Sequence, residues 1–229
     1  VGAGVYLQND GVMVIEGSAN KTLSDGAIYN NGTITHTNDG ALSLGGNFYN
    51  QTGGEYLLVG SGTNISGALS FYNNGTLRKT SSTGTCYITT SFNNGGTLEL
   101  LSGALQFNST FTQTSGTTRL NGGSIGGSTL TIQSGSLTGT GAVNASVTSS
   151  GILVPGSSLG ILNIAGSYSQ NSGASLLLEI GGSALFDKVT VSSSASLNGL
   201  LSVTLTNSFV PTYGQLFTVM TYSKCSNSM

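Results

Sequence analysis

Three stretches of the sequence repeat one pattern: GALSLGGNFYNQTGG (residues 40–54), GALQFNSTFTQTSG (residues 103–116) and GILNIAGSYSQNSG (residues 160–173). Each begins with Gly, a small or apolar residue, Leu, a polar residue and an apolar residue. Each then continues to an aromatic residue (Phe48, Phe111 or Tyr168), a polar amide and a closing Gly. Their starts lie 63 and 57 residues apart, which is close to three units of roughly 20 residues, a common size for one solenoid coil. The repeat therefore predicts a chain of stacked coils.

Short alternating runs indicate strands along the whole chain, and turn dipeptides such as Asn31-Gly32 and Asn74-Gly75 separate them. A unit of roughly 20 residues cannot enclose a core alone, so its apolar face must be covered by the units above and below it. We therefore predict an all-β fold, a parallel β-helix (β-solenoid) of about ten coils of roughly 22 residues. The alternative is an antiparallel β-sandwich, because turn signals about 8–12 residues apart are also typical of that fold.

The composition excludes several classes of partner. Of the 229 residues only 6% are charged, the formal net charge is −2, and 64 Ser or Thr and 20 Asn supply the polarity. No basic field exists to neutralise phosphates, which makes nucleic acid and anionic membranes poor partners. A hydrophobic fraction of 37%, spread in short alternating runs, indicates an ordered chain. No apolar run reaches the ~18 residues of a membrane span, and VGAGVYLQND at the start shows no signal peptide.

The texture of the sequence changes after about residue 173. The runs SLLLEI (175–180), DKVTVSS (187–193), LLSVTLT (200–206) and QLFTVMTY (215–222) are longer and more apolar than those before them. We therefore divide the chain into solenoid coils at residues 1–173 and terminal coils or a cap of the same solenoid at residues 174–229.

Residues 150–206 resemble the repeat of autotransporter passenger regions and of similar large surface or secreted proteins. The motifs that carry this resemblance are a Pro155-Gly156 corner before a G-x-L-x-I strand, Tyr168-x-Gln170, a strand ending in Glu179, Asp187-Lys188 before an alternating strand, and an L-N-G-x-L corner at 197–201. They cover about a quarter of the chain. The resemblance implies a right-handed parallel β-helix with an extracellular structural or adhesive role and no catalytic residues.

His36 is the only histidine, so every His-dependent mechanism would require it. Alternation in TITHT (33–37) places it on the same face as Ile34, which predicts a half-buried structural histidine near the Asp39-Gly40 turn. A metal site is poorly supplied, because one His and two Cys 139 residues apart show no ligand spacing. We expect no cofactor and no metal.

Polysaccharide lyases and hydrolases of this architecture need carboxylates clustered on adjacent coils. Only the first four of the eight acidic residues are dense enough in the sequence to meet, and three of those precede Gly in turn dipeptides. We therefore expect no enzyme activity and no catalytic residues. Two carboxylates from adjacent coils converging in a groove would reverse this expectation. The basic pair Arg78-Lys79 is expected at a solvated corner.

Two sets of residues, the Thr-x-Thr runs and the aromatic side chains, could form binding surfaces on a solenoid. The runs TITHT (33–37), TFTQT (110–114) and TLT (129–131) suggest ice binding, but their starts do not recur once per coil as a flat array would need. Seven aromatic residues could instead form a sugar-stacking stripe, although alternation favours packing in the core for about half of them; these are Phe48, Tyr49, Phe71, Tyr72, Phe92, Phe107 and Phe111.

Seven Asn-x-Ser/Thr sequons are candidate N-glycosylation acceptors if the chain passes through a eukaryotic secretory pathway: Asn20, Asn31, Asn50, Asn64, Asn74, Asn108 and Asn144. This number is close to what chance gives for so many Asn, Ser and Thr. Cys86 and Cys225 would lie about six coils apart, too far for a disulfide within one chain. We expect Cys86 to be a buried or half-buried free thiol and Cys225 to be a candidate for an intermolecular disulfide.

These observations predict an extracellular structural or adhesive β-solenoid module of a surface protein, sheath or filamentous appendage. The alternative is a carbohydrate-active enzyme or a glycan-binding protein on a β-helix. Strand-like sequence near Val1 and Met229 predicts unpaired strand edges. The expected partners are therefore copies of the chain or further segments of it, stacked end to end, with glycans as a further partner class.

Overall fold

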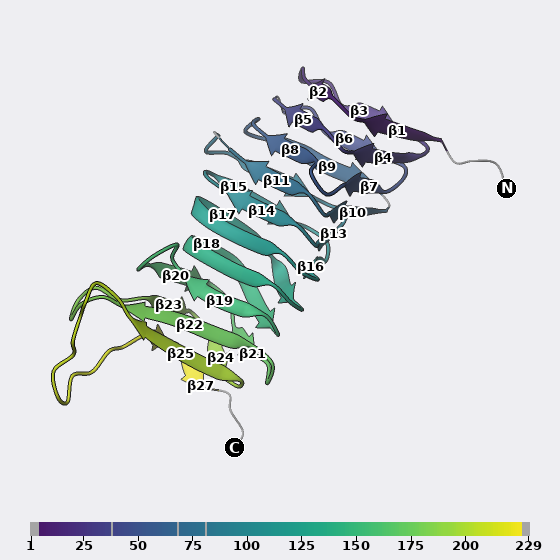
Figure 1. Ribbon diagram of the computed structural model, residues 1–229. Helices are drawn as coiled ribbons and strands as arrows, with labels where there is room; N and C mark the ends of the chain where they lie inside the picture. The colour runs from purple at the N-terminus through teal and green to yellow at the C-terminus, as the bar shows by residue number, and fades with distance from the viewer. Residues whose placement is uncertain (1–4, 38, 68, 81, 226–229) are drawn as a thin grey trace.

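The computed structural model describes residues 5–37, 39–67, 69–80 and 82–225, which form a rod of stacked coils built from strands and turns (Figure 1). The fold is an all-β solenoid of about nine turns, as predicted. Among the described residues every pairing between strands is parallel, and antiparallel contacts are confined to the isolated bridges Gly139–Gly156 and Ile180–Phe186. This pairing excludes the antiparallel sandwich.

Each turn of the chain contributes one strand to each of three columns that run along the rod. The first column contains β1 (Tyr6–Asn9), β4 (Ala27–Asn30), β7 (Phe48–Asn50), β10 (Ser70–Asn73), β13 (Ser91–Asn94), β16 (Phe111–Gln113), β21 (Tyr168–Gln170), β24 (Ser194–Ser196) and β27 (Lys224–Cys225). The second contains β2 (Val12–Ile15), β5 (Thr33–His36), β8 (Glu55–Leu58), β11 (Thr76–Lys79), β14 (Thr97–Leu100), β19 (Ile152–Pro155), β22 (Ser175–Ile180) and β25 (Leu200–Leu205).

The third column contains β3 (Lys21–Leu23), β6 (Leu42–Leu44), β9 (Asn64–Gly67), β12 (Thr85–Ile88), β15 (Ala104–Phe107), β20 (Ile161–Ile164), β23 (Lys188–Val191) and β26 (Met220–Thr221). Two long strands, β17 (Thr117–Ile132) and β18 (Ser136–Ser149), each pass through all three columns and pair with one another along their lengths. They join the two halves of the rod (Figure 1).

The repeat has the period that the sequence predicts, because Phe48 and Phe111 occupy the same row three rungs apart, as do Phe111 and Tyr168. The coils then widen: 17 residues separate Leu130 from Val147, whereas 27 separate Tyr168 from Ala195. Strands after residue 174 continue the same columns, and the proposed division of the chain at this point stays a prediction.

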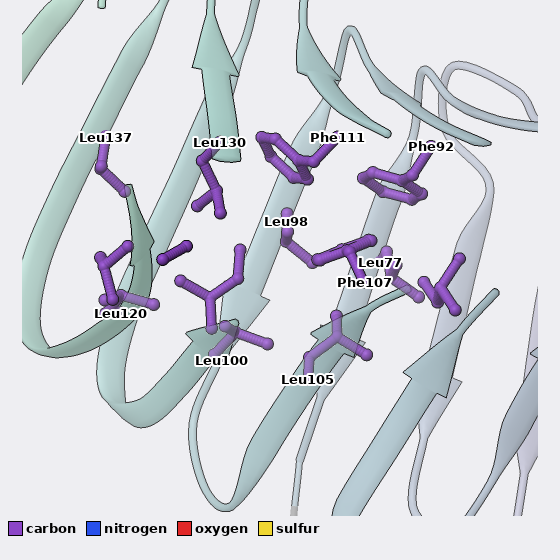
Figure 2. Packing of buried hydrophobic residues seen from close by; sticks show 14 of the residues in the cluster. Leu77, Phe92, Leu98, Leu100, Leu105, Phe107, Phe111, Leu120, Leu130 and Leu137 are labelled. Atoms are coloured by element: carbon purple, nitrogen blue, oxygen red, sulfur yellow. The ribbon is translucent and has the colours of Figure 1, made fainter. Parts of the chain in front are cut away.

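Alternation along the strands fills the interior of the rod with apolar side chains. Phe48, Phe71, Phe92 and Phe111 form one inward row of the first column and are at most 2% exposed. Figure 2 shows Phe92, Phe107 and Phe111 projecting into the same interior as Leu98 and Leu100. Burying each such side chain contributes about 1.5–3 kcal/mol, so the stability of each coil depends on the coils above and below it.

A buried ladder of side-chain amides follows the second inward row of the first column. Its members are Asn9, Asn30, Asn50, Asn73 and Asn94, and each donates from Nδ2 to Oδ1 of the next over 2.7–2.8 Å. Asn94 ends the ladder at Oε1 of Gln113, over 3.4 Å. Each of the first four amides also donates to a main-chain carbonyl in the second column of the next coil, over 2.9–3.2 Å. Because these bonds satisfy buried polar groups at the corner, the ladder fixes where each coil turns.

Candidate functional site

His36 lies inside the second column and is 1% exposed, so it is more deeply buried than predicted. Its Nε2 donates to the carbonyl of Gly40 over 2.8 Å, and its Nδ1, 3.0 Å from the Tyr56 hydroxyl, accepts from it. Burial lowers the pKa of His36 and keeps the ring neutral. Asp39 instead accepts from the amides of Ser61 and Gly62. The structural role predicted for His36 is confirmed, since both ring nitrogens are used within the fold.

The basic pair lies on the second column, where Arg78 forms an outward ion-pair ladder. Its Nη1 donates to Glu55 over 2.7 Å and its Nε donates to Glu99 over 2.8 Å. The three side chains are partly exposed, so each contact adds on the order of 0.5 kcal/mol. These carboxylates come from strands on either side of β11, and the guanidinium that they share offsets one of their two negative charges. The ladder is a feature that spacing in the sequence did not reveal.

Lys79 corrects the expectation of a solvated corner, because its side chain is 0% exposed. It occupies the inward row between Leu58 and Leu100. Its Nζ donates to the carbonyl of Ser82 over 3.2 Å and to the Ser82 hydroxyl over 2.8 Å. Alternation reverses the direction of the side chain from Arg78 to Lys79, so one residue of a basic pair points out and the next points in.

A polar groove of about 300 Å³ lies on the outer face of the second column. Arg119, Thr138 and Glu179 line it together with Ser157 and Ser158 of the loop after Pro155-Gly156. Asp187 lies beside Glu179 but is buried, and it accepts from the amides of Gly160 and Glu179 over 2.7 and 2.8 Å. Burial raises the pKa of Asp187.

Carboxylates of adjacent coils do not converge in the surface hollows found among the described residues. Glu16, Asp39 and Glu179 each line a different hollow. The absence of enzyme activity stays a prediction. The groove at Arg119 and Glu179 nevertheless offers a guanidinium, a carboxylate and hydroxyls to a polar ligand.

The aromatic residues separate into two ladders according to the direction of their side chains. The five phenylalanines of the suggested stripe are core residues, at most 2% exposed. Outside, Tyr29, Tyr49 and Tyr72 stack face to face with centroids 4.8 and 5.1 Å apart. Because the faces that these tyrosines turn toward one another are covered by stacking, they are not available to a sugar ring, which argues against a sugar-stacking stripe.

Two of the three Thr-x-Thr runs recur on consecutive rungs, contrary to the expectation from their spacing. Thr112 pairs with Thr131 in the first column, and Thr131 pairs with Thr148. TITHT belongs to the second column. The sequence positions at which the three runs start therefore do not show that the other two runs align. The physical reason is that coil length varies, and the strand pairing rather than the residue count sets which side chains align.

The sequons lie in different environments, and Asn50 is excluded as an acceptor in the folded chain. Its side chain is 0% exposed and both its amide hydrogens are bonded within the buried ladder. Asn64 is half-buried in β9. The remaining candidates are exposed and stay predictions: Asn20, Asn31, Asn74, Asn108 and Asn144.

The two cysteines are free and lie in different columns and coils. Cys86 is buried in β12, where its Sγ lies 2.7 Å from the hydroxyl of Thr63. Cys225 is exposed in β27. An intermolecular disulfide at Cys225 stays a prediction.

Within residues 5–225, apart from the three undescribed positions 38, 68 and 81, no three His, Cys, Asp or Glu side chains gather as a metal site would require. In the same part of the chain no helix has the length and apolar character to cross a membrane.

The two terminal coils of the described chain expose residues that belong to inward rows. Leu201, Val203 and Leu205 of β25 follow Leu176, Leu178 and Ile180 in register, yet they are 48–54% exposed. At the other end an apolar hollow of about 380 Å³ opens between β1, β2 and β3. Leu7, Met13 and Leu23 are among its lining residues. Both ends therefore present edge strands with core-type side chains.

The stacked coils define this chain as a β-solenoid repeat protein. Comparisons with protein-family models, with curated proteins and with solved structures found no match.

Proposed function

We propose that this chain is a secreted or cell-surface structural and adhesive module, without catalysis, whose coils stack end to end with copies of itself or with further coils of the same polypeptide. The observation that carries the proposal is the uncovered inward row of β25, in which Leu201, Val203 and Leu205 extend the core ladder of the coil before. A further parallel rung would cover this row as β25 covers β22. The motif resemblance of residues 150–206 to autotransporter passenger regions supports the extracellular role.

Self-association tests this proposal. The double variant Leu201→Lys, Val203→Lys places two cations on the exposed edge of the last long rung. The matched control Val210→Lys, Leu216→Lys changes two residues that are more exposed, at 81% and 93%, but lie off that edge. Sedimentation velocity over a concentration series should show association of the parent and of the control and none of the edge variant. A parent that stays monomeric throughout, or an edge variant that associates like the control, would contradict end-to-end stacking between copies.

The polar groove at Arg119 and Glu179 supports a second candidate, a carbohydrate-active or glycan-binding protein. Its side chains offer donors and acceptors to a hydroxyl-rich ligand. Cleavage of neutral or acidic polysaccharides by the parent chain, lost in Glu179→Gln, would favour this candidate over a purely structural module.

A further inference from the structure

The outer face of the first column carries a regular array of hydroxyl groups over five consecutive rungs. Its front row runs through Thr112, Thr131, Thr148, Ser169 and Ser196 in strict register. A second row lies two residues earlier on each strand, and the ten residues together are called the hydroxyl array: Thr110, Thr112, Thr129, Thr131, Ser146, Thr148, Ser167, Ser169, Ser194 and Ser196.

The strand geometry sets both repeats of the hydroxyl array. Neighbouring rungs lie ~4.8 Å apart, and residues i and i+2 of one strand lie ~6.7 Å apart. Five rungs extend the array over roughly 20 Å along the rod. Backbone pairing holds the front row in register over all five rungs, and in the second row it aligns Thr129 with Ser146.

The hydroxyl array faces outward and carries no charge. Thr112, Thr131, Thr148 and Ser169 form no side-chain hydrogen bond to another described residue, so their hydroxyls are available to solvent. In the second row, the hydroxyls of Ser167 and Ser194 lie 3.0 Å apart, and the Ser146 hydroxyl accepts from the amide of Ser167 over 3.2 Å. Leu130 and Val147 lie beneath the hydroxyl array, at most 1% exposed, and hold the strands against the core. Threonine has few χ1 rotamers, so its hydroxyl and methyl groups are ordered before any contact. Because the hydroxyl array carries no charged side chain, no tightly held ionic hydration shell has to be removed when a ligand binds it.

We propose that the hydroxyl array binds the surface of ice. Oxygen atoms on the prism faces of hexagonal ice repeat in two directions with spacings close to those of the array, so many weak contacts form together without rearrangement of either surface. A polysaccharide chain is the poorer match because the aromatic faces that would stack on sugars are absent here: the tyrosine ladder ends at Tyr72, and the next rung carries Asn93. This binding depends on the first column alone and does not rest on end-to-end stacking.

Ice recrystallisation provides the test, with the lowest protein concentration that arrests crystal growth as the measurement. Thr131→Lys places a charged, bulky side chain in the middle of the hydroxyl array, where a central contact contributes most, and should raise that concentration about tenfold or more. Thr97→Lys is the matched control, because Thr97 is an outward, half-buried threonine on the second column. It should leave the activity unchanged.

A second variant of the hydroxyl array and a binding measurement on crystalline cellulose complete the test. Thr148→Lys, one rung further, should produce the same loss, and circular dichroism should show the parent fold in both variants. The proposal is overturned if the parent does not affect ice growth, if Thr97→Lys loses as much activity as Thr131→Lys, or if the parent binds crystalline cellulose while ice growth is unaltered.

Discussion

At the scale of single residues, two asparagines that are adjacent in the sequence differ completely in burial. Asn73 is 0% exposed inside the amide ladder, whereas Asn74 is exposed at the following turn. The buried amide uses both its hydrogens and its oxygen, so it satisfies groups on three coils. One side chain therefore joins the corners of neighbouring coils, and the other only solvates the turn.

Asn73→Ala should lower the free energy of unfolding by about 3 kcal/mol, because it leaves the Nδ2 of Asn50, the Oδ1 of Asn94 and the carbonyl of Thr97 unsatisfied in the interior. Asn74→Ala is the matched control and should change it by less than about 0.5 kcal/mol. Urea unfolding of the two variants measures both values. Equal losses would show that the ladder adds nothing beyond the turn.

His36 gives the folded chain a pH dependence whose sign follows from its burial. Its pKa is lowered in the folded state, because burial disfavours the imidazolium and Lys21 adds a like charge. The unfolded chain therefore takes up the proton first, and stability present above pH ~6.5 is lost as the pH falls, by at most ~1.4 kcal/mol per pH unit. Asp187, whose pKa burial raises, acts in the opposite sense.

The predicted measurement is a comparison of thermal unfolding between pH 7.5 and pH 5. The parent should lose stability over this interval, and His36→Gln should lose distinctly less, although it starts from a lower value at pH 7.5. An unchanged pH dependence in His36→Gln would remove the histidine as its cause.

At the scale of elements, strands of the first column carry a different ladder on each face. Two strands, β7 and β10, carry both an inward phenylalanine (Phe48 or Phe71) and an outward tyrosine (Tyr49 or Tyr72), because successive side chains point to opposite faces. Phe92 meets Phe71, Phe107 and Phe111 with centroids 4.9–5.7 Å apart. The inner ladder thus connects two columns, whereas the outer one connects only rungs.

Phe92→Ala should therefore cost about 3–5 kcal/mol, since the surrounding coils cannot collapse into the cavity. Tyr72→Ala, its outward counterpart one rung earlier, should cost only about 1 kcal/mol because one face of stacking is lost at the surface. Chemical denaturation of both variants checks the ratio. Comparable costs would mean that the outer ladder contributes as much as the core.

The aligned repeats predict one element correctly and misplace another. Phe48 and Phe111 share a row, as the alignment requires, and so do Asn50 and Gln113. In the third column, however, the row of Phe107 contains Leu42 rather than Leu44. The shift is two residues, which keeps apolar side chains inward, so alternation alone could not detect it.

At the scale of the whole molecule, the coils, measured along the first column, are shortest where β17 and β18 pair, with 17 residues from Leu130 to Val147, and longest near β22 and β25. The 27-residue step from Tyr168 to Ala195 contains β22, and the following 30-residue step from Ala195 to Cys225 contains β25; each of these strands has six residues. The exposed aliphatic row of β25 is thus longer than the four-residue edge of β2. Stacking between copies would place a short edge against a long one.

The sequence by itself determined the all-β solenoid, the repeat of roughly 20 residues and the structural role of His36, because alternation and turn chemistry are local and each coil repeats them. Only the tertiary structure decided the buried direction of Lys79, the burial of Asn50, the ion pairs of Arg78 and the alignment of Thr112 with Thr131. Those features depend on which rungs become neighbours. Coils of variable length set that pairing through backbone hydrogen bonds between residues about 20 positions apart, and a residue count along the chain does not contain it.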